Sequence, residues 1–595
     1  MLVRIVFATV ACAVFSSVVA ATTFTVDSTG DSGDSNTADG ACDDGLGNCT
    51  LRAAIEQANA VAGLDTIHFH IPGPGPHTIQ PVTELPIITD PVLIDGYTQP
   101  GASPNTNPPD LGSNAVLIIE LDGSSLPLNG AHSLSIVAGH STVRGMVMNR
   151  LGSSAGASID LSGNGGNTIE GNFIGTDVTG TTIFGFSFSG SVLMGNGSSD
   201  NTIGGVTSAA RNVLSFVRIS GDTTTNNTIA GNFIGTDVTG TTVLGAGSTT
   251  GVSVENSPNN VIGGTTPGAR NIISGNSIGV FLNGSGATGN QIQGNYIGTD
   301  VTGALALGNS SDGVFIVGGA SNNAIGGTLP GAGNVISAND RGVVMGISPA
   351  DNRIEGNFIG TQADGVSPLG NARDGIFITK GTPHNSIGGT DAGAGNTIAF
   401  NGGHGVVLHN ATEVTIRGNS IHSNMDLGID LGGDGITPND DGDADTGPND
   451  LQNFPVLTSA SSGAKTITIT GTLNSTPDTD FALEFFSNST CDPFGHGEGE
   501  LFLGSSLETT LDGDGNVSFT VDFETTVPVG QFITATATNP AGNTSEFSAC
   551  VSVIDREIPA VSLWGLVAMA LLVISAGTIV FGRRCPTYRS YQHKK

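Results

Sequence analysis

The densest group of side chains that could bind a metal ion lies between positions 426 and 445. Its members are all aspartates: Asp426, Asp430, Asp434, Asp440, Asp441, Asp443 and Asp445. Carboxylates this close repel one another unless cations lie between them, and calcium takes roughly six to eight oxygen ligands. The spacing is not that of an EF-hand, because no Glu stands at the twelfth loop position. Two interpretations stay open: calcium held by Asp440, Asp441, Asp443 and Asp445, or a solvated acidic linker.

A histidine between glycines offers a second kind of chemistry. The segment 401–405, Asn-Gly-Gly-His-Gly, contains a triplet that resembles the Gly-His-Gly of polygalacturonases and makes His404 the one candidate catalytic residue. Hydrolysis of a glycosidic bond also requires two carboxyl groups, one to protonate the leaving oxygen and one to activate water. The Asn-Thr-Asp, Asp-Asp and Arg-Ile-Lys motifs of that family are not in place, and Asp440-Asp441 follows His404 instead of preceding it. Position 404 also corresponds to Asp312, Arg341 and Asp374 in other repeats, which indicates a variable surface site.

The cysteines indicate an oxidising compartment. Four of the six lie away from the chain ends, and their proximity in sequence favours the disulfides Cys42–Cys49 and Cys491–Cys550. A zinc site is disfavoured, because there is no Cys-x-x-Cys pair and the two pairs lie far apart in the sequence.

Repeats dominate the middle of the chain. The segments NTIEGNFIGTDVTGTT from Asn167 and NTIAGNFIGTDVTGTT from Asn227 have related copies from Asn290 and Asn352, and short N-x-I-G-G segments alternate with them. Isoleucines recur every ~30 residues: Ile169, Ile203, Ile229, Ile262, Ile292, Ile325, Ile354, Ile387 and Ile416. The aspartates of the GTDVTG segments, Asp177, Asp237 and Asp300, are expected to hydrogen-bond the turn backbone. Such a period indicates a solenoid built from one structural turn per repeat.

Each repeat contains three short apolar pieces bounded by Gly, Asn or Asp, and 90 of the 595 residues are glycine. Strands this short become stable only when each stacks on its counterpart in the next turn, about 4.8 Å away. We therefore predict an all-β fold, a right-handed parallel β-helix with three sheets. The isoleucines would form an interior ladder, and corner asparagines would stack with their amides hydrogen-bonded along the axis.

Both ends of a solenoid need a cap. Residues 49–60 predict a helix with Leu51, Ile55 and Ala58 on one face, and Arg52 and Glu56 are spaced for a surface ion pair. After the repeats, residues 455–555 alternate apolar and polar side chains between turn residues, which is typical of an antiparallel Ig-like sandwich. We divide the chain into a signal peptide (1–20), cap (21–63), β-helix (64–425), Asp-rich loop (426–454), sandwich (455–555) and tail (556–595).

The two ends are predicted to be targeting segments. Residues 1–20 have a basic start, an apolar stretch and the small-residue site Val18-Val19-Ala20, as in a secretory signal peptide. Residues 561–581 are uncharged and long enough to cross a membrane, and the basic pair after them predicts a cytoplasmic tail. The body would then lie outside the cytoplasmic membrane, tethered by this helix.

Two segments resemble known exported bacterial proteins. The tail resembles the IPTL-CTERM sorting signal through Ile558, Pro559, Trp564, Gly565, Arg583 and Arg584, although Ala560-Val561 replaces the usual Thr-Leu. This resemblance implies recognition by an exosortase-type membrane enzyme and release of the body to the outer surface or matrix. The segment Cys49-Thr50-Leu51-Arg52-Ala53-Ala54-Ile55 resembles the CSLREA-type region of exported bacterial repeat proteins.

The charge of the chain excludes some classes of ligand. The formal net charge of −33 disfavours binding of nucleic acid. We expect a non-enzymatic protein of the cell envelope whose β-helix contacts a carbohydrate or cell-surface ligand. The alternative is a polysaccharide lyase or glycoside hydrolase acting on an extracellular glycan. An enzyme requires carboxylates, or an Arg with carboxylates, that converge on adjacent turns, near His404 or Asp374 above all.

Overall fold

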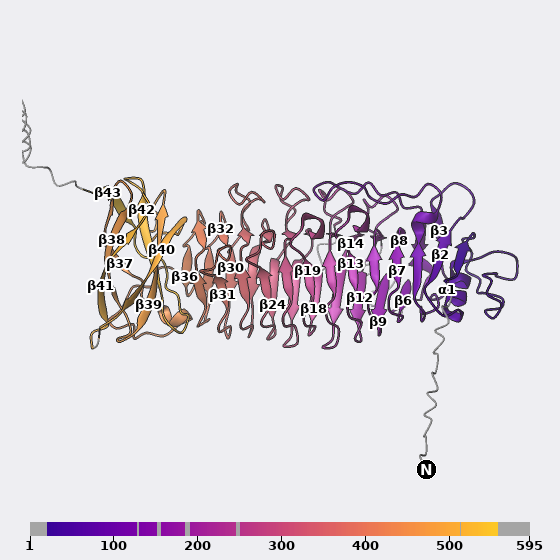
Figure 1. The fold of residues 1–595 in the computed structure, drawn as a ribbon, viewed down its shortest axis with the longest axis horizontal. Helices are drawn as coiled ribbons and strands as arrows, with labels where there is room; N and C mark the ends of the chain where they lie inside the picture. The colour runs from indigo at the N-terminus through magenta and orange to yellow at the C-terminus, as the bar shows by residue number, and fades with distance from the viewer. Residues whose placement is uncertain are drawn as a thin grey trace, which may run out of the picture.

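The computed structural model describes residues 21–127, 130–151, 156–184, 191–245, 250–511 and 513–556. It shows a long rod with the only α-helix of these residues at one end and a further sheet domain at the other (Figure 1). Three parallel sheets run along the rod, and successive turns add one strand to each sheet. This arrangement confirms the predicted three-sheet parallel solenoid and fits a right-handed β-helix.

The first sheet of the rod has 13 strands in sequence order. They are β1 (Thr23–Val26), β2 (Asp65–Phe69), β4 (Val92–Asp95), β7 (Thr142–Arg144), β10 (Thr168–Glu170), β13 (Thr202–Gly204), β16 (Thr228–Ala230), β19 (Val261–Gly263), β22 (Gln291–Gln293), β25 (Ala324–Gly326), β28 (Arg353–Glu355), β31 (Ser386–Gly388) and β34 (Thr415–Arg417). The recurring isoleucines pair residue on residue in this sheet and are fully buried or nearly so. The predicted isoleucine ladder is therefore confirmed.

The second sheet has 12 strands. They are β3 (His77–Ile79), β5 (Ile119–Asp122), β8 (Met146–Asn149), β11 (Phe173–Ile174), β14 (Val213–Leu214), β17 (Phe233–Ile234), β20 (Ile272–Ile273), β23 (Tyr296–Ile297), β26 (Val335–Ile336), β29 (Phe358–Ile359), β32 (Thr397–Ala399) and β35 (Ser420–His422). Most have only two or three residues, because a turn of the solenoid needs no more.

The third sheet has 11 strands and carries the candidate site. They are β6 (Leu134–Ile136), β9 (Ile159–Ser162), β12 (Ser191–Gly195), β15 (Phe216–Ser220), β18 (Thr250–Glu255), β21 (Ile278–Asn283), β24 (Asp312–Val317), β27 (Arg341–Met345), β30 (Ile376–Ile378), β33 (Val406–Leu408) and β36 (Ile429–Leu431). With β1 inside the predicted cap region and β36 inside the predicted Asp-rich loop, the solenoid extends past residues 64 and 425 at both ends.

Asparagines form three ladders along the corners of the rod. Their side-chain amides hydrogen-bond from turn to turn at 2.8 to 3.2 Å. The ladders run from Asn167 to Asn385, from Asn172 to Asn419 and from Asn276 to Asn424. The amides also bond the corner backbone, which satisfies most of the buried polar groups there, although Asn276 Oδ1, at the start of the third ladder, has no partner among the described residues.

The N-terminal end of the rod is closed by α1 (Leu51–Ala60). Its Thr50 cap accepts a hydrogen bond from Ala53 N at 3.1 Å, and Leu51, Ile55 and Ala58 join the solenoid core, as predicted. The expected Arg52–Glu56 ion pair is wrong. Arg52 instead pairs with Asp31 at 2.9 Å, and Glu56 accepts from Asp34 N, because the preceding loop folds back over the helix.

At the other end, residues 456–555 form one seven-stranded sheet. In spatial order its strands are β40 (Leu501–Thr509), β39 (Asp480–Asn488), β42 (Phe532–Thr538), β43 (Val551–Asp555), β37 (Val456–Ser462), β38 (Ile467–Asn474) and β41 (Asn516–Phe523). The sheet is barrel-like: its outer strands β40 and β41 touch, and Gly504 of β40 lies against the ring of Phe523 of β41. An Ig-like pair of sheets is not confirmed, since the strands join in a single order.

The predicted targeting segments lie outside the described residues. This holds for the signal peptide 1–20, for the apolar stretch 561–581 and for the sorting-signal residues Ile558, Pro559, Trp564, Gly565, Arg583 and Arg584. Within the described part of the chain, no helix is long and apolar enough to span a membrane.

Candidate functional site

Charged side chains stack in a column at the start of the 11-stranded sheet. Asp312 and Arg341 pair in register at the first positions of β24 and β27. Backbone hydrogen bonds continue the column, from Gly342 N to the Asp374 carbonyl and from Gly375 N to the His404 carbonyl. The structure thus places His404 at the position expected from the repeat alignment, one turn from Asp374.

The charges of this column neutralise one another. The Arg341 Nε lies 3.1 Å from an Asp374 carboxylate oxygen, and the backbone N–H of His404 donates to the other Asp374 oxygen at 3.3 Å. Asp340 and Arg373, one residue before Arg341 and Asp374, form a second ion pair. Burial raises the pKa of Asp312. The cluster is therefore an alternation of signs along the rod axis, and both arginines are held by carboxylates.

His404 lies between two aspartates from the next turn. Its Nδ1 is 3.6 Å from Asp430 Oδ2, and its Nε2 is 4.0 Å from Asp426 Oδ2. The Asp430 side chain is fully buried and accepts N–H bonds from Gly433 and Gly435 at 2.7 and 3.1 Å, whereas Asp426 is 43% exposed. Neither distance is that of a hydrogen bond, and the buried Nδ1 has no hydrogen-bond partner among the described residues. The two carboxylates therefore place negative charge on both sides of the imidazole without fixing its orientation.

Aromatic rings line the outer face of the same sheet. Phe281, Phe315 and Phe377 are half-buried and occupy one column together with Val344. The Phe281 and Phe315 ring centroids are 5.5 Å apart, and the Arg341 guanidinium lies 4.3 Å from the Phe377 centroid. Ring faces of this kind can stack on flat apolar faces of a ligand, such as the C–H faces of a sugar.

Sequence reasoning missed the phenylalanine column and the partners of His404. Each member comes from a different turn, ~30 residues from the next, so no local motif joins them. The signal that could have found them is the repeat alignment itself, because aligned positions become neighbours in a solenoid.

The Asp-rich loop brings three of its four predicted ligands together. Carboxylate oxygens of Asp440, Asp443 and Asp445 lie within 4.8 Å of one another, while Asp441 is exposed and not part of the group. Burial, together with the neighbouring aspartates, raises the pKa of both Asp443 and Asp445. One buried Asp445 oxygen has no hydrogen-bond partner among the described residues. This oxygen-only donor set fits a calcium ion.

The same loop is anchored to the C-terminal sheet domain. Asp443 accepts from the Ser475 hydroxyl of that domain at 2.6 Å and, within the loop, from Asn453 N at 2.9 Å. Gly442 N donates to Asn474 Oδ1 at 2.7 Å. The acidic group is thus held in place by β38 and its neighbours.

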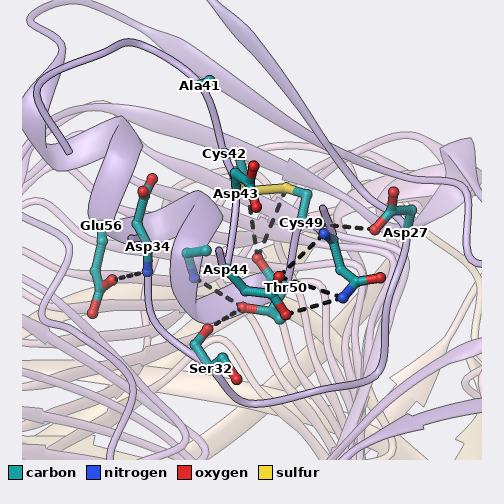
Figure 2. Close-up of a disulfide and its surroundings, with 12 residues drawn as sticks. Asp27, Ser32, Asp34, Ala41, Cys42, Asp43, Asp44, Cys49, Thr50 and Glu56 are labelled. Atoms are coloured by element: carbon teal, nitrogen blue, oxygen red, sulfur yellow. Dashed lines mark hydrogen bonds between the residues drawn. A yellow bond between two sulfur atoms is a disulfide. The ribbon is translucent and has the colours of Figure 1, made fainter. Parts of the chain in front are cut away.

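Both predicted disulfides form, Cys42–Cys49 in the N-terminal loop and Cys491–Cys550 in the C-terminal sheet domain. Figure 2 shows the first beside the start of α1, where Asp27 accepts the N–H of Cys49 at 2.9 Å and the Thr50 hydroxyl donates to the Ser32 carbonyl. The disulfide therefore closes the loop that covers the helix.

Comparison with known proteins assigns no family. No family model and no curated protein matches the chain. Four solved chains match. One of them is a crystal structure of a mutant of the periplasmic alginate epimerase AlgG, with 14% identity and a TM-score of 0.33, covering 60% of this chain and 66% of that chain. This chain therefore spans just under two thirds of the length of that structure.

Proposed function

We propose that this chain is an exported β-helix protein that binds an extracellular polysaccharide on the outer face of its 11-stranded sheet, between β21 and β36. The observation that carries the proposal is the column of half-buried rings, Phe281, Phe315 and Phe377, beside the charged column that ends at His404. A regular, elongated surface of stacked strands suits an elongated ligand with repeating units.

The charges of this face favour a polysaccharide without dense negative charge. Arg341 and Arg373 are both paired with aspartates, so neither is free to attract an anionic chain. The protein as a whole is strongly acidic, with a formal net charge of −33. Its field would slow the approach of a polyanion, and nucleic acid is disfavoured for the same reason.

Removing the rings tests the binding proposal. The full chain, purified in detergent, is screened against neutral and acidic polysaccharides by affinity electrophoresis. Replacing Phe281 and Phe315 together with Ala is expected to weaken binding about tenfold or more, since each stacked ring contributes roughly 0.5–1.5 kcal/mol beyond its buried area. The control Phe494→Ala removes an exposed ring from the C-terminal sheet domain and should leave affinity unchanged. Equal affinity of all three proteins would disprove the proposed face.

The His404 cluster favours a second candidate, a polysaccharide lyase or glycoside hydrolase. Arg341, Asp374, His404 and Asp430 converge from successive turns, which is the arrangement an enzyme requires. In a lyase, His404 would take the proton next to the sugar carboxylate. The glycosidic C–O bond at the adjacent carbon would then break, a C=C bond would form, and the leaving oxygen would take up the proton held by His404.

The same polysaccharide panel separates binding from catalysis. Pectin, alginate and related glycans are incubated with the full chain and assayed for new reducing or unsaturated ends. If product forms with the parent protein and not with His404→Ala, the protein is an enzyme and the binding-only function is wrong. Absence of product together with ring-dependent binding supports the non-enzymatic role.

Export and membrane attachment belong to the proposal. The two disulfides support folding in an oxidising compartment. The signal peptide, the tail helix 561–581 and recognition by an exosortase-type enzyme rest on the sequence alone. Cell fractionation combined with the intact mass of the mature protein tests them: a cytoplasmic chain that keeps residues 1–20 would contradict export.

A further inference from the structure

A buried aspartate at the N-terminal end of the rod has half of its carboxylate unused. Asp65, the first residue of β2, is fully buried. Its Oδ1 accepts the N–H of Thr22 at 2.8 Å. Its Oδ2 is also buried and accepts no hydrogen bond from the described residues. An unpartnered carboxylate oxygen in a protein interior is unfavourable, so this one calls for a donor.

A positively charged donor would suit the surroundings of Asp65 better than a neutral one. Burial raises the pKa of Asp65, and the nearby Asp90 carboxylate raises it further. The Asp90 Oδ2 accepts a hydrogen bond from the N–H of Gly63 at 2.7 Å. Within the described part of the chain, no Arg, Lys or His side chain forms an ion pair with Asp65. A cation placed here would offset both the burial of Asp65 and its repulsion from Asp90.

The backbone N–H that this carboxylate accepts belongs to the predicted start of the mature protein. Thr22 is fixed from both sides, because its N–H donates to Asp65 and its carbonyl accepts from Thr66 N at 2.8 Å. The nitrogen of Ala21 is three covalent bonds before that of Thr22 and therefore lies within about 4 Å of it. Cleavage after Val18-Val19-Ala20 would make this nitrogen the α-ammonium group of the mature chain.

We propose that Asp65 is the binding site for the α-ammonium group of Ala21, which signal-peptide removal creates. In the precursor the nitrogen of Ala21 is a neutral amide with a single N–H. In the processed chain it carries a positive charge and three donors, enough to satisfy Asp65 Oδ2. Processing thus stabilises β1 on β2 and completes the N-terminal end of the rod only after export. The inference rests on the predicted cleavage site and is independent of the ligand that the body binds.

The first test measures the α-amine of the full chain that begins at Ala21. Its reactivity toward an amine-specific label is followed against pH by mass spectrometry. We expect a pKa clearly above the ordinary value of about 8, because a buried carboxylate favours the charged form. An ordinary value in the parent protein would overturn the proposal, and this measurement needs no variant that folds.

The second test couples the terminus to Asp65. Melting temperatures are compared between free and Nα-acetylated chains in three proteins: the parent, Asp65→Asn and Asp90→Asn. Acetylation should lower the melting temperature of the parent and of Asp90→Asn, and it should have no effect on Asp65→Asn. The inference would be refuted if acetylation lowered the melting temperature of Asp65→Asn, or if it left that of the parent unchanged. So would an exported protein whose first residue is not Ala21.

Discussion

In the preceding turns, the amide oxygen of each corner asparagine accepts hydrogen bonds from the asparagine one turn before it. For the last asparagine, Asn424, a carboxylate oxygen of Glu498 plays this part. Its Oε1 accepts both the backbone N–H and the side-chain amide of Asn424, at 3.0 and 3.2 Å. The third asparagine ladder therefore ends on a carboxylate supplied by the C-terminal sheet domain. Glu546 and Glu484 act in the same way toward other backbone N–H groups of the last turns. Three glutamates thus satisfy donors that have no further turn to bond.

These end caps should make stability depend on pH. Burial raises the pKa of Glu498 and of Glu546 to about 7, with smaller contributions from Asp492 and from Asp430 and Asp434. The folded state therefore holds protons that the unfolded state has released between about pH 4.5 and about pH 7. Stability is expected to fall as pH rises through this window, by roughly 3 kcal/mol or less for each group, and to level off above it.

Thermal melting of the full chain across this pH range checks the prediction. The double variant Glu498→Gln and Glu546→Gln removes the two groups whose pKa is raised to about 7 and should reduce the slope of the profile, while Glu484, whose pKa burial also raises, still titrates. Glu524→Gln changes an exposed glutamate of the same sheet domain and should keep the slope of the parent. A melting temperature that rises between about pH 5 and about pH 7 in the parent would contradict the expected sign.

At the scale of elements, the GTDVTG segments are small hairpins that cover the 12-stranded sheet. Asp177, Asp237 and Asp300 accept hydrogen bonds from residues two to five positions on, which confirms their predicted turn role. The last glycine of each GTDVTG segment packs on an aromatic side chain, as Gly180 does on Phe173. The aromatic positions of the repeat therefore lie outside the isoleucine core, under the hairpins.

The Asp-rich loop is the element whose stability should respond to calcium. We expect a Ca²⁺ titration of the full chain to raise the melting temperature, because an ion that binds only the folded state stabilises it by about 2.7 kcal/mol at a hundredfold excess over Kd. Asp445→Asn, which removes the unpartnered carboxylate oxygen, should lose most of this rise.

Asp441→Asn is the matched control, since Asp441 lies in the same loop but outside the group of three. It removes one negative charge and should retain the calcium response. If calcium leaves the parent unchanged, or if both variants lose the response equally, the loop is a solvated linker and not an ion site.

At the scale of the molecule, the rod is closed by different structures at its two ends. Helix α1 covers the first turn, and at the other end Phe486 and Phe547 of the sheet domain join the solenoid core. Arg417 of β34 and the buried Glu484 form an ion pair across this junction at 2.9 Å. Open β-helix ends expose apolar side chains and unpaired strand edges, so we expect both closures to disfavour end-to-end association.

Opening the C-terminal junction should therefore promote self-association. The double variant Arg417→Ala and Glu484→Ala removes the junction ion pair without leaving either charge alone. We expect concentration-dependent oligomers by light scattering, beyond those of the parent. His404→Ala, on the side of the rod, should behave like the parent. A double variant with the mass of the parent at all concentrations would show that the junction does not depend on this pair.

The periodic part of the fold could be predicted from the sequence. Each turn repeats one environment, so the isoleucine spacing and the corner asparagines report the register directly, and the ladders from Ile169 and Asn167 follow the alignment. The helix face of Leu51 and Ile55 and the two disulfides were also predictable, since they depend on residues near in sequence or on few alternatives.

Contacts between distant segments were decided only by the tertiary structure. The alternation of strands from 456 to 555 is the same in a sandwich and in a single curled sheet, because period-two patterning does not record which strands are neighbours. Arg52 pairs with Asp31 and not with Glu56, because the loop that contains Asp31 folds back over the helix. The surroundings of His404, the Asp65 carboxylate and the Glu498 cap likewise combine side chains whose proximity depends on how turns and domains meet in space.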